Sequence, residues 1–379
     1  MKKKILVIAT YGSFFTGFEF SNLNILKDMG FEIHGVANFN DSDHITNNEL
    51  LDEVGMIRHQ IAFSRSPLSV SNISKCRELA KLMKSERFYA IDTHNPVISV
   101  YSRIAAKIAG VPKVIYNAHG FFFYKGAPKI NVVFKWVEST LAGWTDALIT
   151  INKEDYAAAK KMKVRGKAYY IHGVGFDLNR ITNSENNGSV TYVDLSLLED
   201  VPTIASVGEL RTNKNHAAVI RALALLRKQG TDAQYVICGV GDQKDNLLML
   251  ARELGVDDRV HLLGLRDDVI DILRLVDIYV HPSFKEGLSM SIMEAMACGL
   301  PVIATCNGGP KDLIPDGVGG YLVHPDDIDA IASRVQELLS NPELRERFGS
   351  RNAESVKSFA LNVVKREMKS IYHEILQDI

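Results

Sequence analysis

The stretch DIYVHPSFKEGLSMSIMEAMACGLPVIAT, residues 277–305, contains the pattern on which the predicted fold depends. It begins with an apolar run of strand length, residues 277–281, and ends with another, residues 301–305. Between them, residues 291–298 have the length and apolar character of a buried helix. A strand, a helix and a second strand in this order predict a right-handed βαβ unit within a parallel sheet.

The same alternation extends over nearly the whole chain. Continuous apolar runs of strand length are typical of parallel sheets that are covered on both faces. The sequence therefore predicts an α/β protein with two doubly wound, Rossmann-like domains. The strands are predicted at residues 4–9, 32–37, 90–93, 113–117, 147–151 and 169–171 in the first half, and at 203–208, 234–239, 260–264, 277–281, 301–305 and 320–323 in the second.

A polar, turn-prone stretch interrupts this alternation near the middle of the chain. Residues 183–189 are NSENNGS, a composition typical of loops and turns. We therefore expect a linker region over 183–200, an N-terminal domain over 1–182 and a C-terminal domain over 201–358. The remaining segment, 359–379, is predicted to contain an amphipathic helix. A ligand cleft is expected where the carboxyl ends of the two sheets meet.

The overall composition excludes several classes of protein. Lys and Arg total 44 and Asp and Glu total 45, and this balance argues against binding of a nucleic-acid backbone. The four cysteines lack the spacing of a zinc site and are too few for a disulfide framework, so we expect a reducing compartment. The first apolar run, residues 5–9, is too short for a signal peptide or a membrane span. These features favour a cytoplasmic protein.

Charge is distributed unevenly between the two halves of the chain. Residues 1–180 contain 24 Lys and Arg against 16 Asp and Glu, whereas residues 181–379 contain 20 against 29. Such a division favours different partners for the two domains. Cationic side chains near anionic lipid contribute about 1 kcal/mol each to membrane binding. The basic half therefore suits peripheral contact with the inner face of a membrane, although it could equally serve only to keep the protein soluble.

Two carboxylates flank the first turn of the helix predicted at residues 291–298. Glu286 precedes the start of the helix, which is expected near Ser289, and Glu294 lies about five residues inside it, about 7–8 Å along the axis. The N–H groups of a first helical turn attract anions such as phosphate, so two carboxylates there could hold the ends of one ligand with a central pyrophosphate. Alternatively, Glu286 caps the helix and Glu294 is solvated. However, apolar residues surround Glu294, and a carboxylate buried among them needs hydrogen-bond donors.

This segment resembles the signature of the retaining glycosyltransferases of family 4, which have the GT-B fold. The signature is a Glu, seven further residues, and a second Glu on a helix that ends in Ala-x-Gly-x-Pro. Glu286 and Glu294 have this spacing, and Gly299 and Pro301 complete the pattern. The resemblance extends from the first predicted strand to about residue 340. It implies two domains that face each other across a cleft, with a final helix that crosses back to the first domain.

The resemblance also implies roles for the residues of the signature. Glu286 would be a catalytic residue in contact with the donor hexose. Glu294 would bind the ribose hydroxyls of the nucleotide. The other donor-binding candidates here are the backbone amides of Gly287, Leu288 and Ser289, which would approach the distal phosphate.

Further donor-binding candidates follow the strand predicted at residues 203–208. Two cations, Arg211 and Lys214, suit a pyrophosphate at this strand end, although a solvated loop would give the same sequence. In the family, a Gly-Arg pair is followed by a Lys six residues after the Gly, and both cations bind the donor phosphates. Lys214 matches that Lys, but Glu209 replaces the arginine, so Arg211 would have to supply the second charge. The remaining candidates are Gly12, after the first strand, and Gly239, near the expected nucleotide base.

Acceptor-side candidates come from the first half of the chain. His119 follows a predicted strand, and family members carry His-Gly at this point near the reacting sugar, so His119 is predicted to be catalytic. The aromatic residues after it either pack against the sheet or stack on a ligand. The run HGFFFYKGAP, residues 119–128, resembles a subset that makes bacterial exopolysaccharide or capsule. The acceptor-side candidates are Asn95, which stands where the family often has Thr, together with Phe121 and Tyr124.

These residues and the resemblance together predict a hexosyltransferase or N-acetylhexosaminyltransferase. The donor would be a nucleotide-sugar, by family habit a UDP-sugar. The acceptor would be a growing polysaccharide precursor, linked to polyprenyl pyrophosphate. We expect no cofactor and no metal, because cations and a helix N-terminus can stabilise the leaving diphosphate. Two alternatives stay open, namely a nucleotide-sugar 2-epimerase of the same architecture and a non-catalytic glycan-binding protein.

Overall fold

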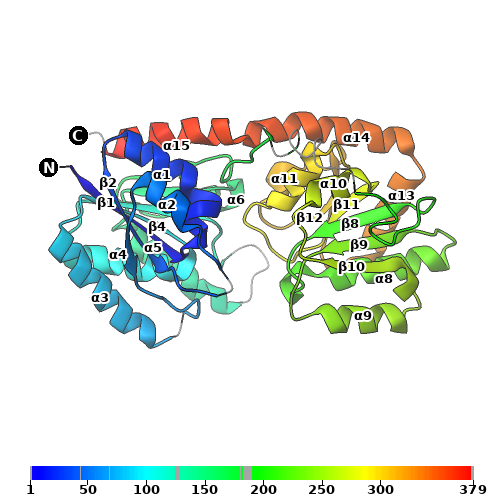
Figure 1. Ribbon diagram of the computed structural model, residues 1–379, viewed down its shortest axis with the longest axis horizontal. Helices are drawn as coiled ribbons and strands as arrows, with labels where there is room; N and C mark the ends of the chain where they lie inside the picture. The colour runs from blue at the N-terminus through cyan, green and yellow to red at the C-terminus, as the bar shows by residue number, and fades with distance from the viewer. Residues whose placement is uncertain are drawn as a thin grey trace. The chain divides into compact units, whose positions relative to one another are not determined.

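The chain forms two compact units, each with one parallel sheet covered by helices (Figure 1). Unit 1 comprises Met1–Gly175 and Leu361–Ile379, and unit 2 comprises Phe176–Ala360. The predicted α/β class with two doubly wound sheets is confirmed. The computed structural model describes residues 2–42, 44–67, 69–123, 129–179, 181 and 190–376.

The sheet of unit 1 has the strand order β3-β2-β1-β4-β5-β6-β7, and every neighbouring pair is parallel. The chain leaves β1 toward one edge and returns at β4 toward the other. The loops after β1 and β4 therefore part at the carboxyl edge of the sheet, where such sheets bind ligands. The strands are β1 (Lys4–Tyr11), β2 (Glu32–Asn38), β3 (Ile57–Gln60), β4 (Ala90–His94), β5 (Lys113–Ala118), β6 (Ala147–Thr150) and β7 (Lys167–Tyr170).

Helices cover both faces of this sheet. Helices α3, α4 and α5 pack on one another in that order, and α1 packs on both α2 and α15. The core on the α3–α4 side joins apolar residues of these helices to β1, β2, β4 and β5. The helices of unit 1 are α1 (Phe20–Asp28), α2 (Asn48–Val54), α3 (Ser71–Glu86), α4 (Pro96–Ala109), α5 (Val132–Ala142), α6 (Lys153–Ala159) and α15 (Leu361–Leu376).

Unit 2 repeats the plan with the strand order β10-β9-β8-β11-β12-β13, again all parallel. The order reverses between β8 and β11, so the loops after these two strands part at the carboxyl edge. The strands are β8 (Thr203–Val207), β9 (Gln234–Cys238), β10 (Val260–Gly264), β11 (Ile278–His281), β12 (Val302–Thr305) and β13 (Gly320–Val323). The helices are α8 (His216–Lys228), α9 (Lys244–Glu253), α10 (Val269–Arg274), α11 (Met290–Ala297), α12 (Pro310–Leu313), α13 (Ile328–Leu339) and α14 (Pro342–Ser355).

The division between the units differs from the expected domain boundaries. It falls between Gly175 and Phe176, because the Phe176 side chain is fully buried in the core of unit 2. Within the expected linker, residues 183–189 lie outside the described part of the chain. Residues after them belong to unit 2, where Leu195 and Leu197 are buried against β9 and α10. Apolar residues of this segment thus anchor it in unit 2, and only the preceding residues 183–189 have the polar composition of a linker.

None of the helices in the described part of the chain has both the length and the apolar character needed to cross a membrane.

Candidate active site

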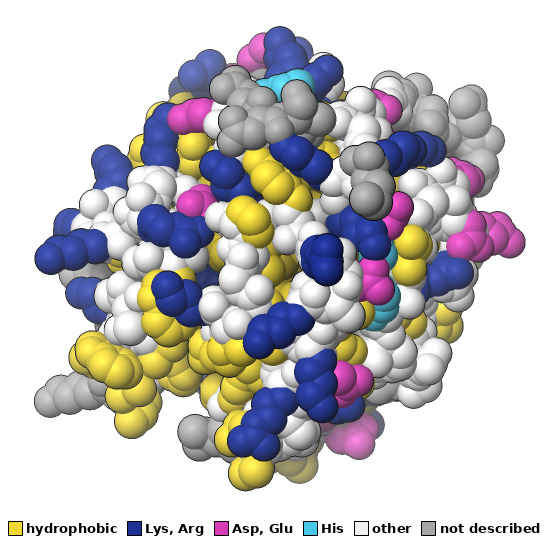
Figure 2. Space-filling view, turned by 90° about the vertical axis from the view of Figure 1, so that its left-hand side faces the viewer, with side chains coloured by type: hydrophobic (Ala, Val, Ile, Leu, Met, Phe, Trp, Pro, Cys, Tyr) yellow, Lys and Arg dark blue, Asp and Glu magenta, His cyan; other side chains and the backbone are white. Residues whose placement is uncertain are grey.

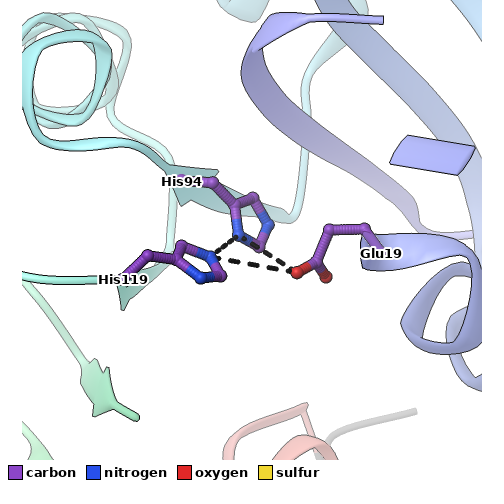
Figure 3. A group of neighbouring side chains, drawn as sticks. All are labelled: Glu19, His94 and His119. Atoms are coloured by element: carbon purple, nitrogen blue, oxygen red, sulfur yellow. Dashed lines mark hydrogen bonds and ion pairs between the residues drawn. The ribbon is translucent and has the colours of Figure 1, made fainter. Parts of the chain in front are cut away.

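The first candidate cluster lies in unit 1 and consists of Glu19, His94 and His119 (Figure 3). His94 ends β4, His119 follows β5, and Glu19 ends a π-helical turn, Phe15–Glu19, of a kind that is frequent at functional sites. Because β4 and β5 are parallel neighbours, their carboxyl ends bring the two imidazoles together. His94 Nδ1 lies 3.2 Å from His119 Nε2 and 3.5 Å from Glu19 Oε1. His119 Nε2 lies 4.0 Å from the same carboxylate oxygen.

Burial determines the protonation of this cluster. Glu19 and His94 are buried, whereas the side chain of His119 is 18% exposed and so accessible to a ligand. Burial, reinforced by the charge of Asp92, raises the pKa of Glu19 to about 8, although a hydrogen bond from Asn22 opposes the rise. Burial lowers the pKa of His119 to about 4 and that of His94 well below its ordinary value. At neutral pH both imidazoles are therefore neutral and Glu19 is mostly protonated.

A buried aspartate, Asp92, supports the cluster from the side of the sheet. His94 Nε2 lies 3.5 Å from Asp92 Oδ1. The Asn117 side chain donates to Oδ1 at 2.7 Å, and the Tyr372 hydroxyl donates to Oδ2 at 2.6 Å. Burial raises the pKa of Asp92 to about 7, and these two hydrogen bonds limit the rise. Because Tyr372 belongs to α15, the last helix of the chain takes part in the network behind His94.

The three converging atoms of the cluster also have the spacing of a metal-ligand set. His94 Nδ1, His119 Nε2 and a carboxylate oxygen of Glu19 lie within 4.8 Å of one another. Two imidazoles and one carboxylate are a combination that zinc accepts. A proton shared between the imidazoles, which lie 3.2 Å apart, satisfies the same lone pairs. The two imidazoles can therefore share a hydrogen bond, or all three side chains can coordinate a metal ion.

Two other predicted residues of unit 1 have a structural reason for their identity. A Cβ at Gly12 would lie 2.4 Å from Thr46 Oγ1, so packing after β1 requires glycine at this position whether or not a ligand approaches. Asn95 follows β4 with a φ of 62°, a positive value that is uncommon for residues other than glycine. Its Oδ1 accepts a hydrogen bond from the Thr10 backbone N–H at 3.0 Å. Asn95 thus ties the loop after β4 to the end of β1.

Of the two aromatic residues predicted on the acceptor side, Phe121 is buried, and a neighbouring ring is exposed instead. Phe121 is 1% exposed and stacks on Phe123 with ring centroids 4.8 Å apart. It therefore packs against the sheet, which is one of the two alternatives that the sequence left open. Phe122, between them, is exposed. Tyr124 lies outside the described residues.

The second candidate cluster lies in unit 2, at the carboxyl ends of β8 and β11. Lys214 ends a 3-10 turn, Thr212–Lys214, that follows β8, and Glu286 lies in the loop after β11. Lys214 Nζ donates to Glu286 Oε1 at 2.6 Å. His281, the last residue of β11, places Nε2 3.2 Å from the same oxygen. Two residues predicted from separate motifs, Lys214 and Glu286, are therefore direct partners.

Glu286 is held in its ionised form. Burial would raise its pKa, but the hydrogen bond from His281 and the charge of Lys214 outweigh burial and lower the pKa to about 2. The side chains of Lys214 and Glu286 are 23% and 15% exposed, so a ligand can reach both. The pair is an arrangement in which an incoming anion can compete for the ammonium group.

The loop that carries Glu286 is fixed by its neighbours. The Phe284 N–H donates to the Asn213 carbonyl at 2.9 Å, which joins this loop to the turn that carries Lys214. On the other side, the Gly309 N–H donates to the Glu286 carbonyl at 3.2 Å. A Cβ at Gly309 would lie only 1.9 Å from the carbonyl oxygen of Gly287. This close approach requires glycine at 309.

Helix α11 begins where the signature places it. Ser289 is the N-cap residue, and its Oγ accepts a hydrogen bond from the Ile292 N–H at 3.4 Å. Glu294 is 8% exposed within α11, whose other buried residues belong to an apolar core, so it is not a solvated helix residue. Burial raises the pKa of Tyr279, and the charges of both Glu286 and Glu294 add to the rise. Gly287 and Leu288 are half-buried in the loop before the cap.

The other predicted donor-binding residues occupy the ends of β8 and β9. Arg211 Nε lies 2.9 Å from Glu209 Oε2, and both side chains are more than half exposed. The residue that replaces the family arginine therefore pairs with Arg211. A Cβ at Gly239 would lie 1.9 Å from the Gly208 carbonyl oxygen, so glycine at 239 allows the loops after β8 and β9 to touch.

Comparison with known proteins identifies the family of the chain. A family model described as "Glycosyl transferase 4-like" matches residues 4–152, and one described as "Glycosyl transferases group 1" matches residues 194–355. EpsD of Bacillus subtilis (strain 168), itself assigned as a glycosyltransferase, is 34% identical over 98% of this chain and 97% of its own length. The chain belongs to glycosyltransferase family 4.

Further comparisons agree with this family and establish the fold. The UDP-Gal:alpha-D-GlcNAc-diphosphoundecaprenol alpha-1,3-galactosyltransferase of Escherichia coli is 28% identical over 81% of each chain. Sucrose-phosphate synthase from Thermosynechococcus elongatus has a TM-score of 0.78 at 19% identity and covers both chains completely. HepE from Anabaena, solved with UDP and glucose, has a TM-score of 0.75 at 20% identity over 98% of this chain and 100% of its own. The glycosyltransferase therefore has the GT-B fold.

Glu19, His94 and His281 of this glycosyltransferase are not among the site residues predicted from the sequence. His94 and His281 are each the last residue of a strand in the middle of a parallel sheet, and strand position alone marks them as candidates. Glu19 has a weaker signal. It lies seven residues after Gly12, in a helical stretch whose other inward-facing residues are apolar.

Proposed function

We propose that this glycosyltransferase moves a hexose or N-acetylhexosamine from a UDP-sugar to a hydroxyl of a lipid-linked glycan, with retention of anomeric configuration. The observation that supports this proposal most strongly is the Lys214–Glu286 pair, 2.6 Å apart, in the loops beside the capped N-terminus of α11. A cation, an ionised carboxylate and a helix N-terminus are the groups that a sugar diphosphate requires.

Donor binding follows from the chemistry of this pair. The diphosphate carries negative charge, so the Lys214 ammonium turns from Glu286 toward a phosphate oxygen. Glu286 stays ionised because His281 still donates to it, and its freed oxygen accepts a hydrogen bond from a sugar hydroxyl. Glu294, buried in α11, accepts hydrogen bonds from the ribose hydroxyls. Each carboxylate then receives donors from the ligand in place of water.

The transfer step breaks the bond between the anomeric carbon and the diphosphate oxygen. Lys214 and the N-terminus of α11 stabilise the negative charge on the leaving diphosphate, and no metal is required for this. The acceptor oxygen forms the new bond on the same face of the sugar, and its proton passes to the departing phosphate oxygen. His119, a neutral imidazole at pH 7, accepts a hydrogen bond from the sugar without adding positive charge.

The acceptor class rests on the names of relatives and on the charge of the first half. The names of two relatives include an acceptor linked to undecaprenol diphosphate. One is the Escherichia coli relative, and the other, from Campylobacter jejuni, is 32% identical over 46% of this chain. Such an acceptor is anchored in a bilayer. We therefore propose that the protein works as a peripheral protein at the inner face of the membrane. Its basic first half suits an anionic surface.

An assay of UDP release tests the proposed reaction. Purified protein is given UDP-sugars with and without an undecaprenyl-diphosphate-linked glycan, in detergent and with EDTA present. We expect release that depends on the acceptor and persists with EDTA. Lys214→Ala should lower turnover by about 10–100-fold, the value of one charge-assisted contact, whereas Lys228→Ala on the surface of α8 should leave it unchanged. UDP release without any acceptor would favour an epimerase, and failure to bind UDP would favour a non-catalytic glycan-binding protein.

A further inference from the structure

Helix α5 of unit 1 presents an apolar surface to solvent. Val132, Val133 and Trp136 lie on one side of this helix, and all three are more than half exposed. Ile130, in the turn before the helix, is also more than half exposed, and the Phe122 side chain is exposed nearby. The rings of Phe122 and Phe134 lie 5.1 Å apart, so the aromatic loop after β5 packs on α5. Five large apolar side chains in one region exceed the scattered exposure that is usual on soluble proteins.

An apolar cavity of about 190 Å³ extends this surface toward α4 and the start of α3. Val133, Phe134 and Val137 of α5 line one side of it, and Pro67 and Tyr101 line the other. The buried Glu138 also lines the cavity and is paired with Arg103 at 2.8 Å, so this carboxylate already has a partner. The cavity can therefore accept hydrocarbon without leaving a charge unpaired.

Helix α3, which packs on α4 as α5 does, carries a basic stripe. Val70 and Ile73, at its start, are more than half exposed. Arg77, Lys81 and Lys84 follow at intervals of three and four residues, and the helical repeat therefore places them on the same side as Ile73. All three cations are exposed, and within the described part of the chain none of them forms an ion pair.

The positive charge of the first half is concentrated around this region. Residues 61–140, which contain α3, α4 and α5, have twelve Lys and Arg against four Asp and Glu. The rest of residues 1–180 has twelve of each. Of the four acidic residues, Asp92 and Glu138 are buried. Lys and Arg side chains are spread over the face drawn in Figure 2, and hydrophobic side chains gather in its lower half.

We propose that the docking face, defined as Val70, Ile73, Arg77, Lys81 and Lys84 of the α3 region with Ile130, Val132, Val133 and Trp136 of the α5 region, binds an anionic lipid bilayer. Tryptophan prefers the membrane–water interface, and exposed apolar side chains enter the acyl boundary while cations stay among the headgroups. A second copy of the chain would bring two basic stripes together, and protein interfaces are depleted in lysine. The bilayer is therefore the occupant that the charge favours. This inference rests on the proposed function, because a lipid-linked acceptor gives the docking its purpose.

Vesicle co-sedimentation tests the docking face with matched variants. We expect the full chain to bind vesicles of phosphatidylglycerol and phosphatidylcholine far better than vesicles of phosphatidylcholine alone. The variant R77E/K81E/K84E should lose roughly 100-fold in binding to the anionic vesicles. The control K365E/R366E/K369E makes the same change in charge on exposed residues of α15 and should bind like wild type. Equal loss in both variants would overturn the proposal, because total charge and not the docking face would then explain binding.

Tryptophan fluorescence tests the apolar part separately. The chain has two tryptophans, so Trp144→Phe leaves Trp136 as the reporter. We expect its emission to shift to shorter wavelength on addition of anionic vesicles, and the variant V133S/W136S in the natural background to bind about tenfold more weakly. An unshifted emission with vesicles bound would overturn the assignment of α5 to the interface.

One pair of assays separates failure of docking from failure of the proposed function. Acceptor-dependent UDP release in detergent does not require a bilayer, and the docking variants should retain it. If wild type transfers sugar in detergent but does not bind vesicles, the docking proposal is wrong and the proposed function stands. If it binds vesicles through the docking face but releases no UDP with any acceptor, the proposed function is wrong and the docking proposal stands.

Discussion

Glu19 is a buried carboxyl group whose protonation unit 1 controls. In the unfolded chain it titrates near the ordinary pKa of 4.5, and in the folded chain burial raises the pKa to about 8. A raised carboxyl pKa stabilises the folded state below pH 4.5, and this contribution is lost as pH rises through 8. The proton concerned is that of the Glu19 carboxyl group, which lies beside His94 and His119. Its pKa therefore sets the charge of the cluster.

We therefore predict that the free energy of unfolding of wild type falls, relative to Glu19→Gln, between pH 5 and pH 8. At about 1.4 kcal/mol for each unit of pKa, the relative change amounts to a few kcal/mol. Urea unfolding followed by tryptophan fluorescence measures it in unit 1, which contains both Trp136 and Trp144. If the two proteins gave parallel pH profiles, Glu19 would titrate normally and its place in the proposed site would be wrong.

Part of the candidate site could be predicted from the sequence and part could not. Glu286 and Glu294 lie eight positions apart in a pattern that one helix start explains. Glu19, His94 and His119 are separated by 75 and 25 positions and meet only because β4 returns beside β1 and β5 lies beside β4. No local pattern encodes that meeting, and the neutral state of the two histidines depends on burial that only the folded chain provides.

At the scale of elements, the last helix matters more than its distance along the chain suggests. Tyr372 of α15 donates to Asp92, which lies behind His94 in the centre of the sheet. We predict that Tyr372→Phe destabilises unit 1 by about 1–3 kcal/mol, because Asp92 then stays buried with one donor fewer. Urea unfolding measures the loss. Tyr156→Phe, at a half-buried tyrosine of α6, is the control and should change stability little. An equal loss of stability in both variants would show that the hydrogen bond from Tyr372 of α15 to Asp92 does not stabilise unit 1.

The loop after β12 is a second element on which the site depends. Gly309→Ala places a Cβ 1.9 Å from the Gly287 carbonyl oxygen, so the loop that carries Glu286 must move. A displacement of about 1 Å at a reacting group can cost 100-fold in rate, and we predict at least a tenfold fall in turnover in the assay of acceptor-dependent UDP release. Gly143→Ala, at the end of α5, meets no atom closer than 3.5 Å and serves as the control. Unchanged turnover in Gly309→Ala would show that the position of the loop does not matter.

Elements were predicted well where burial on both faces makes a strand apolar, and poorly elsewhere. Strands β1, β5 and β9 follow continuous apolar runs. Strand β3, at the edge of its sheet, has the sequence IRHQ with most side chains exposed, and periodicity gives it no signal. Helix α14 also has a weak sequence signal, since most of its residues are polar and only a few are buried.

The whole molecule contains two parallel sheets that are both doubly wound. The first half of the sequence is basic and the second half is acidic. The order of elements predicts the doubly wound sheets because each crossover between parallel strands is right-handed. The division between the units could not be predicted to the residue, since it depends on which core receives Phe176. Each unit contributes one candidate cluster at the point where its strand order reverses. In the proposed function, both clusters serve one transfer reaction.

In the proposed function, Lys214 and Glu286 form the binding site of a nucleotide diphosphate. Calorimetric titration of the full chain with UDP tests it most directly, with Lys214→Ala and Lys228→Ala titrated alongside wild type. We expect wild type and Lys228→Ala to bind UDP alike, and Lys214→Ala to bind it about 10–100-fold more weakly. Equal affinity in all three proteins would show that the diphosphate binds elsewhere and that Lys214 does not hold it.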